Sequence, residues 1–353
     1  MPETLVEPAS FVCPTPLGTH DRVVLGHGSG GRLSAQLIQD IFLPIFDNPV
    51  LDRLDDQAVL QIGNSQVAFT TDSFVVQPLF FPGGDIGSLA VHGTVNDLAM
   101  GGATPLYLSA GFIAEEGLPL QTLRCVAASM ARAASDAGVL IVTGDTKVVE
   151  HGKGDGLFIN TTGIGVVPKG VRLSANQAQP GDLVILSGPI GDHGIAIMAS
   201  RQGLEFETTV QSDSAPLHRL VAAMLDVSRN IRCLRDPTRG GLSSTLNEIA
   251  AQSRVSIEID ERRIPVHDEV RAACELLGLD PLYVANEGKL AAIVPPEDAE
   301  GVLAAMRANP HGKDAAIIGV VQKERPGAVL LRTTFGSTRI VDLLAGDQLP
   351  RIC

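Results

Sequence analysis

Short runs of β-branched and apolar residues, each ended by Gly, Asp or Pro, alternate along this chain with segments of helical spacing. The apolar residues of 123–134 recur every three or four positions, which places them on one face of a helix, and residues 242–250 repeat this spacing. Strands mixed with helices of these lengths predict an α/β (α+β) fold. The predicted strands are 67–71, 139–143, 157–161, 183–186 and 290–294.

The chain length of 353 residues corresponds to about two domains. A turn-rich stretch over 167–182 separates two strand-like runs and is the best candidate boundary. We therefore expect an N-terminal domain over 23–170 and a C-terminal domain over 171–345. The Pro-containing segment 1–22 is predicted to be a flexible extension, and residues 346–353 a mobile tail.

Composition excludes several classes of function. The net charge of −13 argues against a nucleic-acid binder with a broad basic surface, and the absence of Trp removes the aromatic platforms of single-strand binders. No Lys or Arg precedes Arg22 and no apolar run reaches about 18 residues, so we expect neither a signal peptide nor a membrane span. The five cysteines are scattered and form no CxxC pair, which favours a reducing, cytoplasmic location over disulfides or a zinc site.

A glycine-rich loop lies near the start of the chain. Gly26, Gly28 and Gly31 match GxGxxG after the strand-like run 23–25, and a helix-like stretch follows. Only glycine lets backbone N–H groups approach an anion this closely, so phosphate binding is one interpretation and a plain glycine-rich turn is the commoner one. A dinucleotide-binding fold would place an acid at a strand end about 20 residues on. That position falls near Asp47 in a Pro-flanked turn, and no Walker A motif is present.

Acidic residues stand repeatedly beside glycine or at predicted strand ends. Asp72 follows the strand 67–71, and Asp145 follows the strand 139–143 through Gly144. Hard cations such as Mg²⁺ take oxygen ligands and bridge carboxylates to substrate phosphates. A single Asp is more often a turn or helix cap, but the set together favours a metal–nucleotide site. Its members are Asp55, Asp56, Asp72, Asp97, Asp145 and Asp236.

Two further charged residues flank apolar strands. Lys147 stands two residues past Asp145, and Glu287 precedes the strand 290–294. A lysine in that place can contact phosphate, or act as a base when it is desolvated. The alternative for both residues is a solvated surface charge. The eight histidines show no HxH or HExxH spacing, so histidine metal chemistry has no support.

The chain ends in a cysteine, Cys353, where we expect a mobile and exposed terminus. Residues 346–353 would reach up to roughly 28 Å when extended. A thiol on such an arm can load at one site and react at another, and the alternative is a chance terminal cysteine. Prenylation is excluded because it needs a cysteine four residues from the end.

Together these segments resemble the aminoimidazole ribonucleotide synthetase superfamily, which includes selenophosphate synthetase and thiamine-monophosphate kinase. The resemblance runs from about Val23 to Cys353. The ending Pro-Arg-Ile-Cys is similar to the signature tail of one subfamily, the carbamoyl dehydratases that make the cyanide ligands of nickel–iron hydrogenase. The matching segments are 27–31, 55–59, 70–102, 143–148, 191–194, 235–241 and 350–353.

The resemblance implies an N-terminal ATP-binding domain that dimerises through its sheet into a shared, barrel-like interface, and a C-terminal α/β domain beside it. ATP would lie between the domains. By family position, Mg²⁺ would be held by Asp56, Asp72, Asp97 and Asp236. ATP would be bound by Gly28, Gly30, Gly31, Asp55, Asn96, Asp145 and Thr146, and the catalytic residues would be Cys353, Lys147 and Glu287.

In the same subfamily the carbamoyl group arrives from the carbamoyltransferase HypF, and the nitrile leaves to iron on the HypC–HypD scaffold. The resemblance therefore implies a thiocarbamate on Cys353, phosphorylation of its carbonyl oxygen by ATP, and proton removal by Lys147 and Glu287 to give a thiocyanate. Two alternatives stay open. One is another ATP- and Mg²⁺-dependent kinase or synthetase of the superfamily without the thiol arm, and the other is a non-catalytic carrier whose tail docks a partner.

Overall fold

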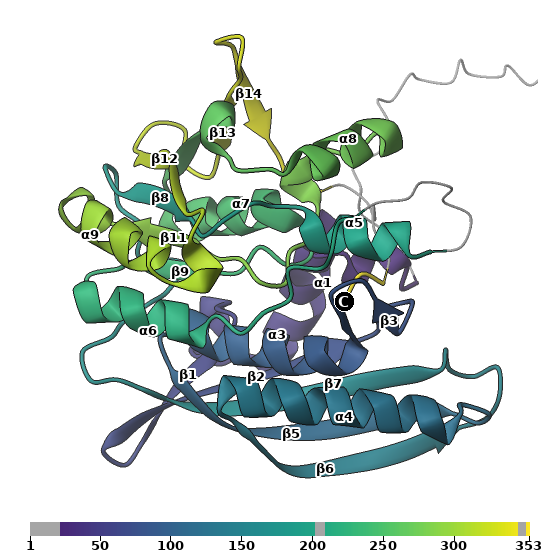
Figure 1. Ribbon diagram of the computed structural model, residues 1–353. Helices are drawn as coiled ribbons and strands as arrows, with labels where there is room; N and C mark the ends of the chain where they lie inside the picture. The colour runs from purple at the N-terminus through teal and green to yellow at the C-terminus, as the bar shows by residue number, and fades with distance from the viewer. Residues whose placement is uncertain (1–21, 202–208, 345–350) are drawn as a thin grey trace, which may run out of the picture.

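The computed structural model describes residues 22–201, 209–344 and 351–353. Two sheets, each covered by helices, form an upper and a lower half of the molecule (Figure 1). The predicted mixed α/β class is confirmed. Of the predicted extension only Arg22, and of the predicted tail only its last three residues, are among the described residues. No helix within these ranges combines the length and apolarity that a membrane crossing needs.

The first sheet has five strands in the order β1-β2-β7-β5-β6, and all neighbours are antiparallel except the parallel pair β5–β6. Its elements are β1 (Ala58–Ile62), β2 (Ser65–Phe74), β5 (Thr104–Glu115), β6 (Leu140–Val149), β7 (Leu157–Val167), the helices α3 (Ile86–Met100) and α4 (Leu120–Ala137), and the short pair β3 (Phe80–Phe81) and β4 (Gly84–Asp85). Burial alternates residue by residue along β7, because one face packs against helices and the other does not. Figure 1 shows α3 and α4 on the covered face.

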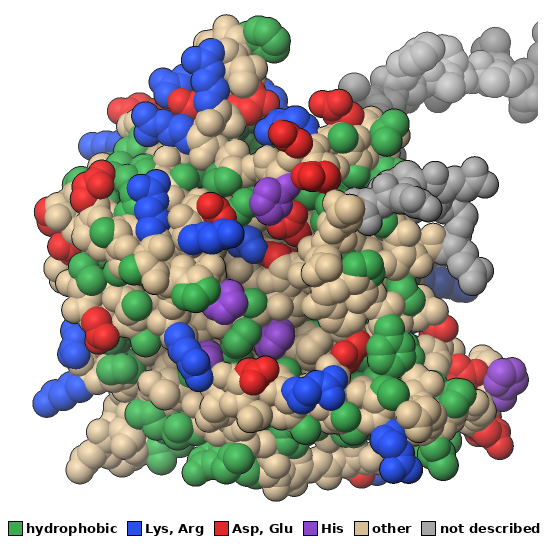
Figure 2. Space-filling model, viewed as in Figure 1, with side chains coloured by type: hydrophobic (Ala, Val, Ile, Leu, Met, Phe, Trp, Pro, Cys, Tyr) green, Lys and Arg blue, Asp and Glu red, His purple; other side chains and the backbone are tan. Residues whose placement is uncertain are grey.

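The opposite face of this sheet carries exposed apolar side chains. Phe69, Ile164 and Tyr107 are direct register partners on β2, β7 and β5, and all three are exposed. On the edge strand β6, Leu140 and Val142 are exposed as well. Apolar side chains also gather along the lower edge of the molecule, where β5 and β6 lie (Figure 2).

The second sheet has seven strands in the order β14-β13-β10-β12-β8-β11-β9. Its elements are β8 (Leu183–Leu186), β9 (Cys233–Arg235), β10 (Ser256–Asp260), β11 (Ala291–Val294), β12 (Ala316–Gln322), β13 (Val329–Arg332), β14 (Thr338–Val341), α5 (Asp192–Ala199), α6 (His218–Val227), α7 (Gly241–Ser253), α8 (Asp268–Leu277) and α9 (Pro296–Arg307). Ile185 of β8 belongs to the apolar cluster of α6 and α9, whereas its neighbours Val184 and Leu186 belong to the cluster of α7. The central strands are buried on both faces, which explains their continuous apolar runs.

Helix α3 joins the two halves. Leu98 and Met100 share an apolar cluster with residues of α6 and β8. The buried amide of Asn96 donates to the carbonyl oxygens of Ala215 (3.0 Å) and Glu287 (3.2 Å), and its oxygen accepts from the N–H of Leu217 (2.8 Å). Asn96 therefore fixes the N-terminal helix against loops of the C-terminal half.

Three details of the sequence prediction are wrong. Residues 23–25 form no strand; the N–H of Val24 bonds to Nδ1 of His27 (3.0 Å), and a 3₁₀ turn η1 (Leu25–Gly28) leads to α1 (Arg32–Leu37). The strands β2 and β6 also run past Asp72 and Asp145 instead of ending before them. Gly144 does not interrupt β6, because the missing side chain lets the strand approach β5; a Cβ there would lie 2.3 Å from the carbonyl oxygen of Ala110.

The start of α3 offers a test of how this helix is held. Asp85 caps it, and its Oδ1 accepts from the N–H groups of Gly87 (2.7 Å) and Ser88 (3.2 Å). We expect Asp85→Ala to lower the free energy of unfolding by about 1 kcal/mol, because two helix N–H groups lose their acceptor. Urea unfolding measures this change. The exposed Asp226→Ala is the control, and equal stability of the two variants would contradict the capping role.

Candidate active site

Four predicted metal ligands come from four separate elements at the junction of the two halves. Asp56 precedes β1, Asp72 lies in β2, Asp97 in α3, and Asp236 follows β9. Burial raises the pKa of Asp97 well above its usual range, and repulsion from the other three aspartates raises it further. Because these carboxylates interact through a desolvated region, they form one acidic cluster.

The pKa values of two members show how unfavourable this concentration of charge is. Burial raises the pKa of Asp56 to about 6, although Arg235 lies 2.7 Å away and opposes the shift. Burial and the neighbouring Asp56 raise the pKa of Asp236 to about 8. The carboxylates repel one another and lack the solvation that would stabilise their charge.

A divalent hard cation fits this acidic cluster chemically, because the donors are all carboxylate oxygens and their repulsion would be relieved by positive charge. Within the described ranges, however, no three acidic, histidine or cysteine side chains already converge as ligands. Oδ2 of Asp97 accepts from the hydroxyl of Thr70 (2.9 Å), and Asp56 is paired with Arg235.

The end of the chain is docked against β2 and the residues that follow it. The N–H of Val75 donates to the carbonyl oxygen of Cys353 (3.0 Å), and the N–H of Gln77 donates to that of Arg351 (3.3 Å). Ile352 packs into the apolar cluster that contains Phe74. Cys353 is therefore only 7% exposed, so the expectation of an exposed terminal thiol is wrong for this conformation.

Side chains hold the same three residues from several directions. Arg351 donates through Nε to the carbonyl oxygen of Val75 (3.1 Å) and forms an ion pair with Asp155. Arg201 donates to the carbonyl oxygen of Arg351 (3.0 Å). Nε2 of His193 bonds to the carbonyl oxygen of Ile352 (2.8 Å).

The thiol of Cys353 lies among residues that the sequence predicts to be functional. Burial raises its pKa, the positive charge of Arg239 opposes that shift, and Glu287, Asp72 and Asp236 raise it further. Arg239 is a site residue that the sequence reasoning missed. It lies within segment 235–241, one of those that resemble the family, but nothing in the local sequence pattern indicates that its charge acts on Cys353.

Glu287 is buried beside the acidic cluster. It is 3% exposed, and its Oε1 has no hydrogen-bond partner. Burial raises its pKa well above the usual range, and repulsion from Asp236 and Asp72 adds to the effect. A second residue missed by the sequence reasoning, Asp213, accepts from the backbone N–H of Glu287 (3.0 Å) and fixes the position of this segment.

The glycine-rich loop packs onto the same region. Nη1 of Arg239 donates to the carbonyl oxygen of Gly28 (3.1 Å). A Cβ on Gly30, whose φ is +74°, would lie 2.6 Å from the carbonyl oxygen of Arg239, and one on Gly31 would lie 2.4 Å from that of Leu344. These close approaches require glycine, so the loop is specified by its packing whether or not a phosphate binds there.

Other predicted nucleotide contacts lie apart from this cluster in the single chain. Lys147 and Asp145 are exposed on β6 and form an ion pair of 2.5 Å, and the N–H of Thr146 donates to Asp145 (2.8 Å). Within the described residues, no contact joins Lys147 to Glu287. The amide of Asn96 is already used by backbone groups.

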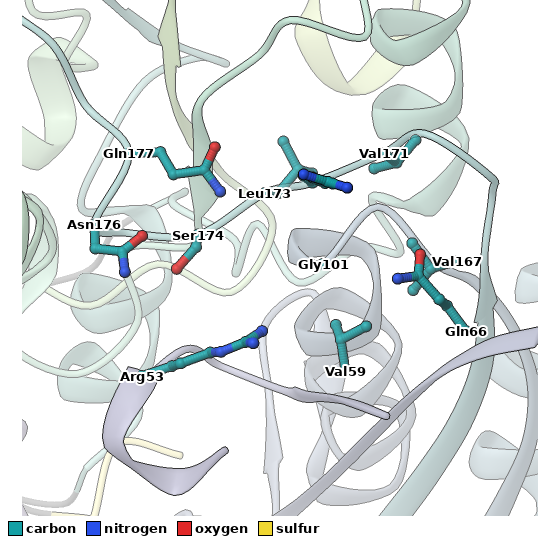
Figure 3. Close-up of a pocket in the computed structure, with 11 residues that line it drawn as sticks. Arg53, Val59, Gln66, Gly101, Val167, Val171, Leu173, Ser174, Asn176 and Gln177 are labelled. Atoms are coloured by element: carbon teal, nitrogen blue, oxygen red, sulfur yellow. The ribbon is translucent and has the colours of Figure 1, made fainter. Parts of the chain in front are cut away.

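Asp55, the neighbour of Asp56, contacts Ser174 at the rim of a cavity of about 410 Å³ that none of the four aspartates of the acidic cluster lines. It accepts from the hydroxyl of Ser174 (3.0 Å) and the N–H of Ala175 (3.1 Å), and so ties the start of β1 to the linker between the halves. Figure 3 shows Arg53 and Gln177 extending into the cavity. Its lining residues are Arg53, Val59, Gln66, Gly101, Val167, Val171, Arg172, Leu173, Ser174, Asn176 and Gln177.

Two segments of the chain match the models of a known family. Residues 54–167 match the family described as AIR synthase related protein, N-terminal domain, and residues 179–332 match its C-terminal domain. The chain belongs to this AIR synthase related family, which confirms the resemblance seen in the sequence.

Within that family the chain belongs with the HypE proteins. It is 61% identical to the carbamoyl dehydratase HypE of Azotobacter vinelandii over 331 residues, which are 94% of this chain and 97% of the relative. A solved HypE–HypF complex matches with a TM-score of 0.83 at 50% identity, over 87% of this chain and 99% of that chain. A HypE structure in complex with ATP matches with a TM-score of 0.79 at 53% identity, over 94% and 100%.

The raised pKa values predict an unusual pH dependence of stability. Asp56 and Asp236 have folded pKa values of about 6 and about 8, above the ordinary 3.8, so the folded state holds protons that the unfolded state releases. Without divalent cations, the free energy of unfolding should fall as pH rises from about 4 to 8, by at most about 1.4 kcal/mol per pH unit for one group. Urea unfolding in a chelator across this range measures it.

In Asp236→Asn the fall between about pH 6 and 8 should become shallower, because the carboxyl group with a pKa of about 8 is gone. The exposed Asp226→Asn serves as the control and should keep the wild-type slope. A wild-type slope in Asp236→Asn would contradict the assignment of the raised pKa to Asp236.

Proposed function

We propose that this protein is an ATP-dependent carbamoyl dehydratase that converts a thiocarbamate on Cys353 into a thiocyanate and so supplies the cyanide ligands of nickel–iron hydrogenase. The observation that carries the proposal is the docked chain end, which buries the thiol of Cys353 within electrostatic range of Glu287, a buried acid whose Oε1 lacks a partner. Relatives that are about 60% identical and named carbamoyl dehydratase support it.

The reaction needs an activated oxygen. A thiocarbamate, S–C(=O)–NH₂, would have to expel hydroxide to become a nitrile, and hydroxide is a poor leaving group. Transfer of the γ-phosphoryl group of ATP to the carbonyl oxygen, with loss of one N–H proton, gives an S–C(OPO₃)=NH species. Breaking its C–O bond releases phosphate, and loss of the second N–H proton completes S–C≡N.

The acidic cluster and the glycine-rich loop suit the phosphoryl transfer. Mg²⁺, when bound, would neutralise charge on the phosphates. Asp56, Asp72, Asp97 and Asp236 would hold it, since these desolvated carboxylates repel one another without a cation. The loop of Gly28, Gly30 and Gly31 lies against Arg239 at the same junction, where nucleotide phosphates would be bound between the two domains.

Glu287 is the proposed base for the N–H protons. Its raised pKa makes it a stronger base than an ordinary carboxylate, and Arg239 favours its charged form. The burial of Glu287 and Cys353 also excludes bulk water, which would otherwise attack the activated carbon.

Lys147 is proposed to act from a second copy of the chain. In a single chain Lys147 is exposed on β6, and no contact among the described residues joins it to Glu287. β6 is the edge strand of a sheet whose outer face carries exposed apolar side chains. An apolar face of this kind marks an interface. A homodimer formed through these sheets, with the barrel-like interface that the family implies, would bring Lys147, Asp145 and Thr146 of one copy to the partner's nucleotide.

The proposed partners follow from the chemistry. The carbamoyl donor would be HypF, as the solved HypE–HypF complex of a relative supports, and the acceptor of the nitrile would be the iron on HypC–HypD. The four described cysteines, Cys125, Cys233, Cys274 and Cys353, are free, which suits the cytoplasm. The proposed division is an N-terminal domain over 23–170, a C-terminal domain over 171–345 and a tail over 346–353.

Removal of the thiol separates this function from its rivals. We expect Cys353→Ala to abolish formation of the modified protein while the fold and Mg·ATP binding persist, because one sulfur atom at the chain end is lost. Intact-mass spectrometry with HypF, and calorimetry with Mg·ATP, measure the two properties. The exposed Cys125→Ala is the control. A superfamily kinase would keep its activity in Cys353→Ala, and a pure carrier would hydrolyse no ATP in the wild type.

Proton removal is tested by a different variant. We expect Glu287→Gln to bind Mg·ATP nearly normally and to accumulate carbamoylated protein, because loss of a general base costs about 10²- to 10⁴-fold in rate. Lys147→Ala should behave similarly, with the exposed Lys153→Ala as its control. Intact mass distinguishes the carbamoyl form, about 43 Da heavier than the free protein, from the cyanated form, about 25 Da heavier. The lighter product at a normal rate would remove that residue from the mechanism.

A further inference from the structure

His193 is buried at the N-terminal end of α5 and has no part in the chemistry described above. Its Nε2 lies 2.8 Å from the carbonyl oxygen of Ile352, the residue before the terminal thiol. Its Nδ1 lies 2.8 Å from the hydroxyl of Ser212. The ring packs edge-on against Phe81, with 5.6 Å between the ring centres, so the imidazole is fixed in three directions.

These partners define one tautomer. A carbonyl oxygen only accepts, so Nε2 must carry the hydrogen and donate to Ile352. Nδ1 is then the acceptor, and the hydroxyl of Ser212 donates to it. The oxygen of Ser212 in turn accepts from the N–H of Ser214 (3.1 Å), so every polar atom of this chain of contacts is satisfied. Burial lowers the pKa of His193, which agrees with a neutral ring.

The loop that orients His193 also holds Glu287. Oδ1 and Oδ2 of Asp213 accept from the N–H groups of Glu287 (3.0 Å) and Gly288 (3.2 Å), and Oδ2 is 3.0 Å from Nζ of Lys289. Gly288 lies so close to this loop that a Cβ would be 1.8 Å from the carbonyl oxygen of Asp213. Ser212 therefore acts through His193 on the segment that carries Cys353, and the adjacent Asp213 fixes the backbone of Glu287. Cys353 and Glu287 are the two reacting groups of the proposed function.

We propose that His193 is a positioning residue that seats Cys353 against Glu287, with Ser212 fixing the tautomer that donates to the tail. The role rests on the proposed function only for the identity of the reacting groups. The seating itself is a property of the unmodified chain, because the hydrogen bond reaches the backbone of Ile352 and not the thiol.

Alkylation of Cys353 by iodoacetamide measures the seating without any catalysis. A lysine-specific protease releases residues 324–353, in which Cys353 is the one cysteine, so the rate is followed by the mass of this fragment. The alkylation rate of the wild-type protein is first measured without nucleotide and with Mg·ATP. The variants are then compared in the condition in which the wild-type thiol reacts more slowly. We expect His193→Leu to raise the rate roughly 5- to 10-fold, the effect of losing one hydrogen bond from a docked segment.

Three further variants make the test specific. His193→Gln restores an N–H donor at similar reach and should return the rate to within about 2-fold of the wild type. Ser212→Ala leaves the imidazole ring in place but removes the hydroxyl that fixes its tautomer. It should therefore raise the alkylation rate less than His193→Leu does. His92→Leu disturbs the same loop through the contact of His92 Nδ1 with the hydroxyl of Ser214 (2.9 Å), without touching the tail, and should leave the rate unchanged.

A folded His193→Leu protein with wild-type protection would overturn the proposal, and so would equal deprotection by His92→Leu. If His193→Leu does not fold, the Ser212→Ala rate decides in the same way. With carbamoylated protein, His193→Leu should slow dehydration while Mg·ATP affinity stays the same, and His193→Gln should rescue the rate. If His193→Leu exposes the thiol as expected but the carbamoylated wild-type protein shows no dehydration, the proposed function is refuted and the seating role stands.

Discussion

The burial of negative charge at the junction of the two halves is the constraint on which the rest of the structure depends. Asp56, Asp72, Asp97 and Asp236 reach this region from different elements, and burial raises the pKa of each. Such an arrangement destabilises the isolated fold, so it persists only because surrounding interactions over-determine it. Arg235 and Arg239 supply the nearby positive charge. Arg235 joins Asp56 to Glu248, and Arg239 donates to the glycine-rich loop and interacts electrostatically with Cys353.

In the proposed function, the docked chain end brings the reacting thiol to this acidic region. Arg351 and Cys353 accept backbone hydrogen bonds from the segment after β2, and Ile352 supplies an apolar anchor. The same contacts bury the thiol within electrostatic range of Glu287, Asp72 and Asp236, and they do not use the thiol itself. A tail held by its backbone is free to carry a group on sulfur, which is what a carrier arm requires. The docked segment is short, so only a few hydrogen bonds hold it in place.

Much of the architecture was predictable from local pattern. The helices around 123–134 and 242–250 and all five expected strands are present, because apolar periodicity reports which face is buried. The strand expected at 23–25 failed because the N–H and the carbonyl oxygen of Val24 both bond locally to His27. The aspartates were found by their positions, but Arg239, Asp213 and His193 were not. Each depends on a partner more than 70 residues away in the sequence, and no local spacing reports such contacts.

The central claim is that the docked thiol of Cys353 carries the group on which ATP acts. The most direct measurement is the intact mass of the wild-type protein after carbamoylation by HypF, removal of nucleotide, and then addition of Mg·ATP. We expect a species about 43 Da heavier than the free protein before ATP, replaced by one about 25 Da heavier after it. A carbamoyl form that persists unchanged with ATP, or a modification on any residue other than Cys353, would contradict it.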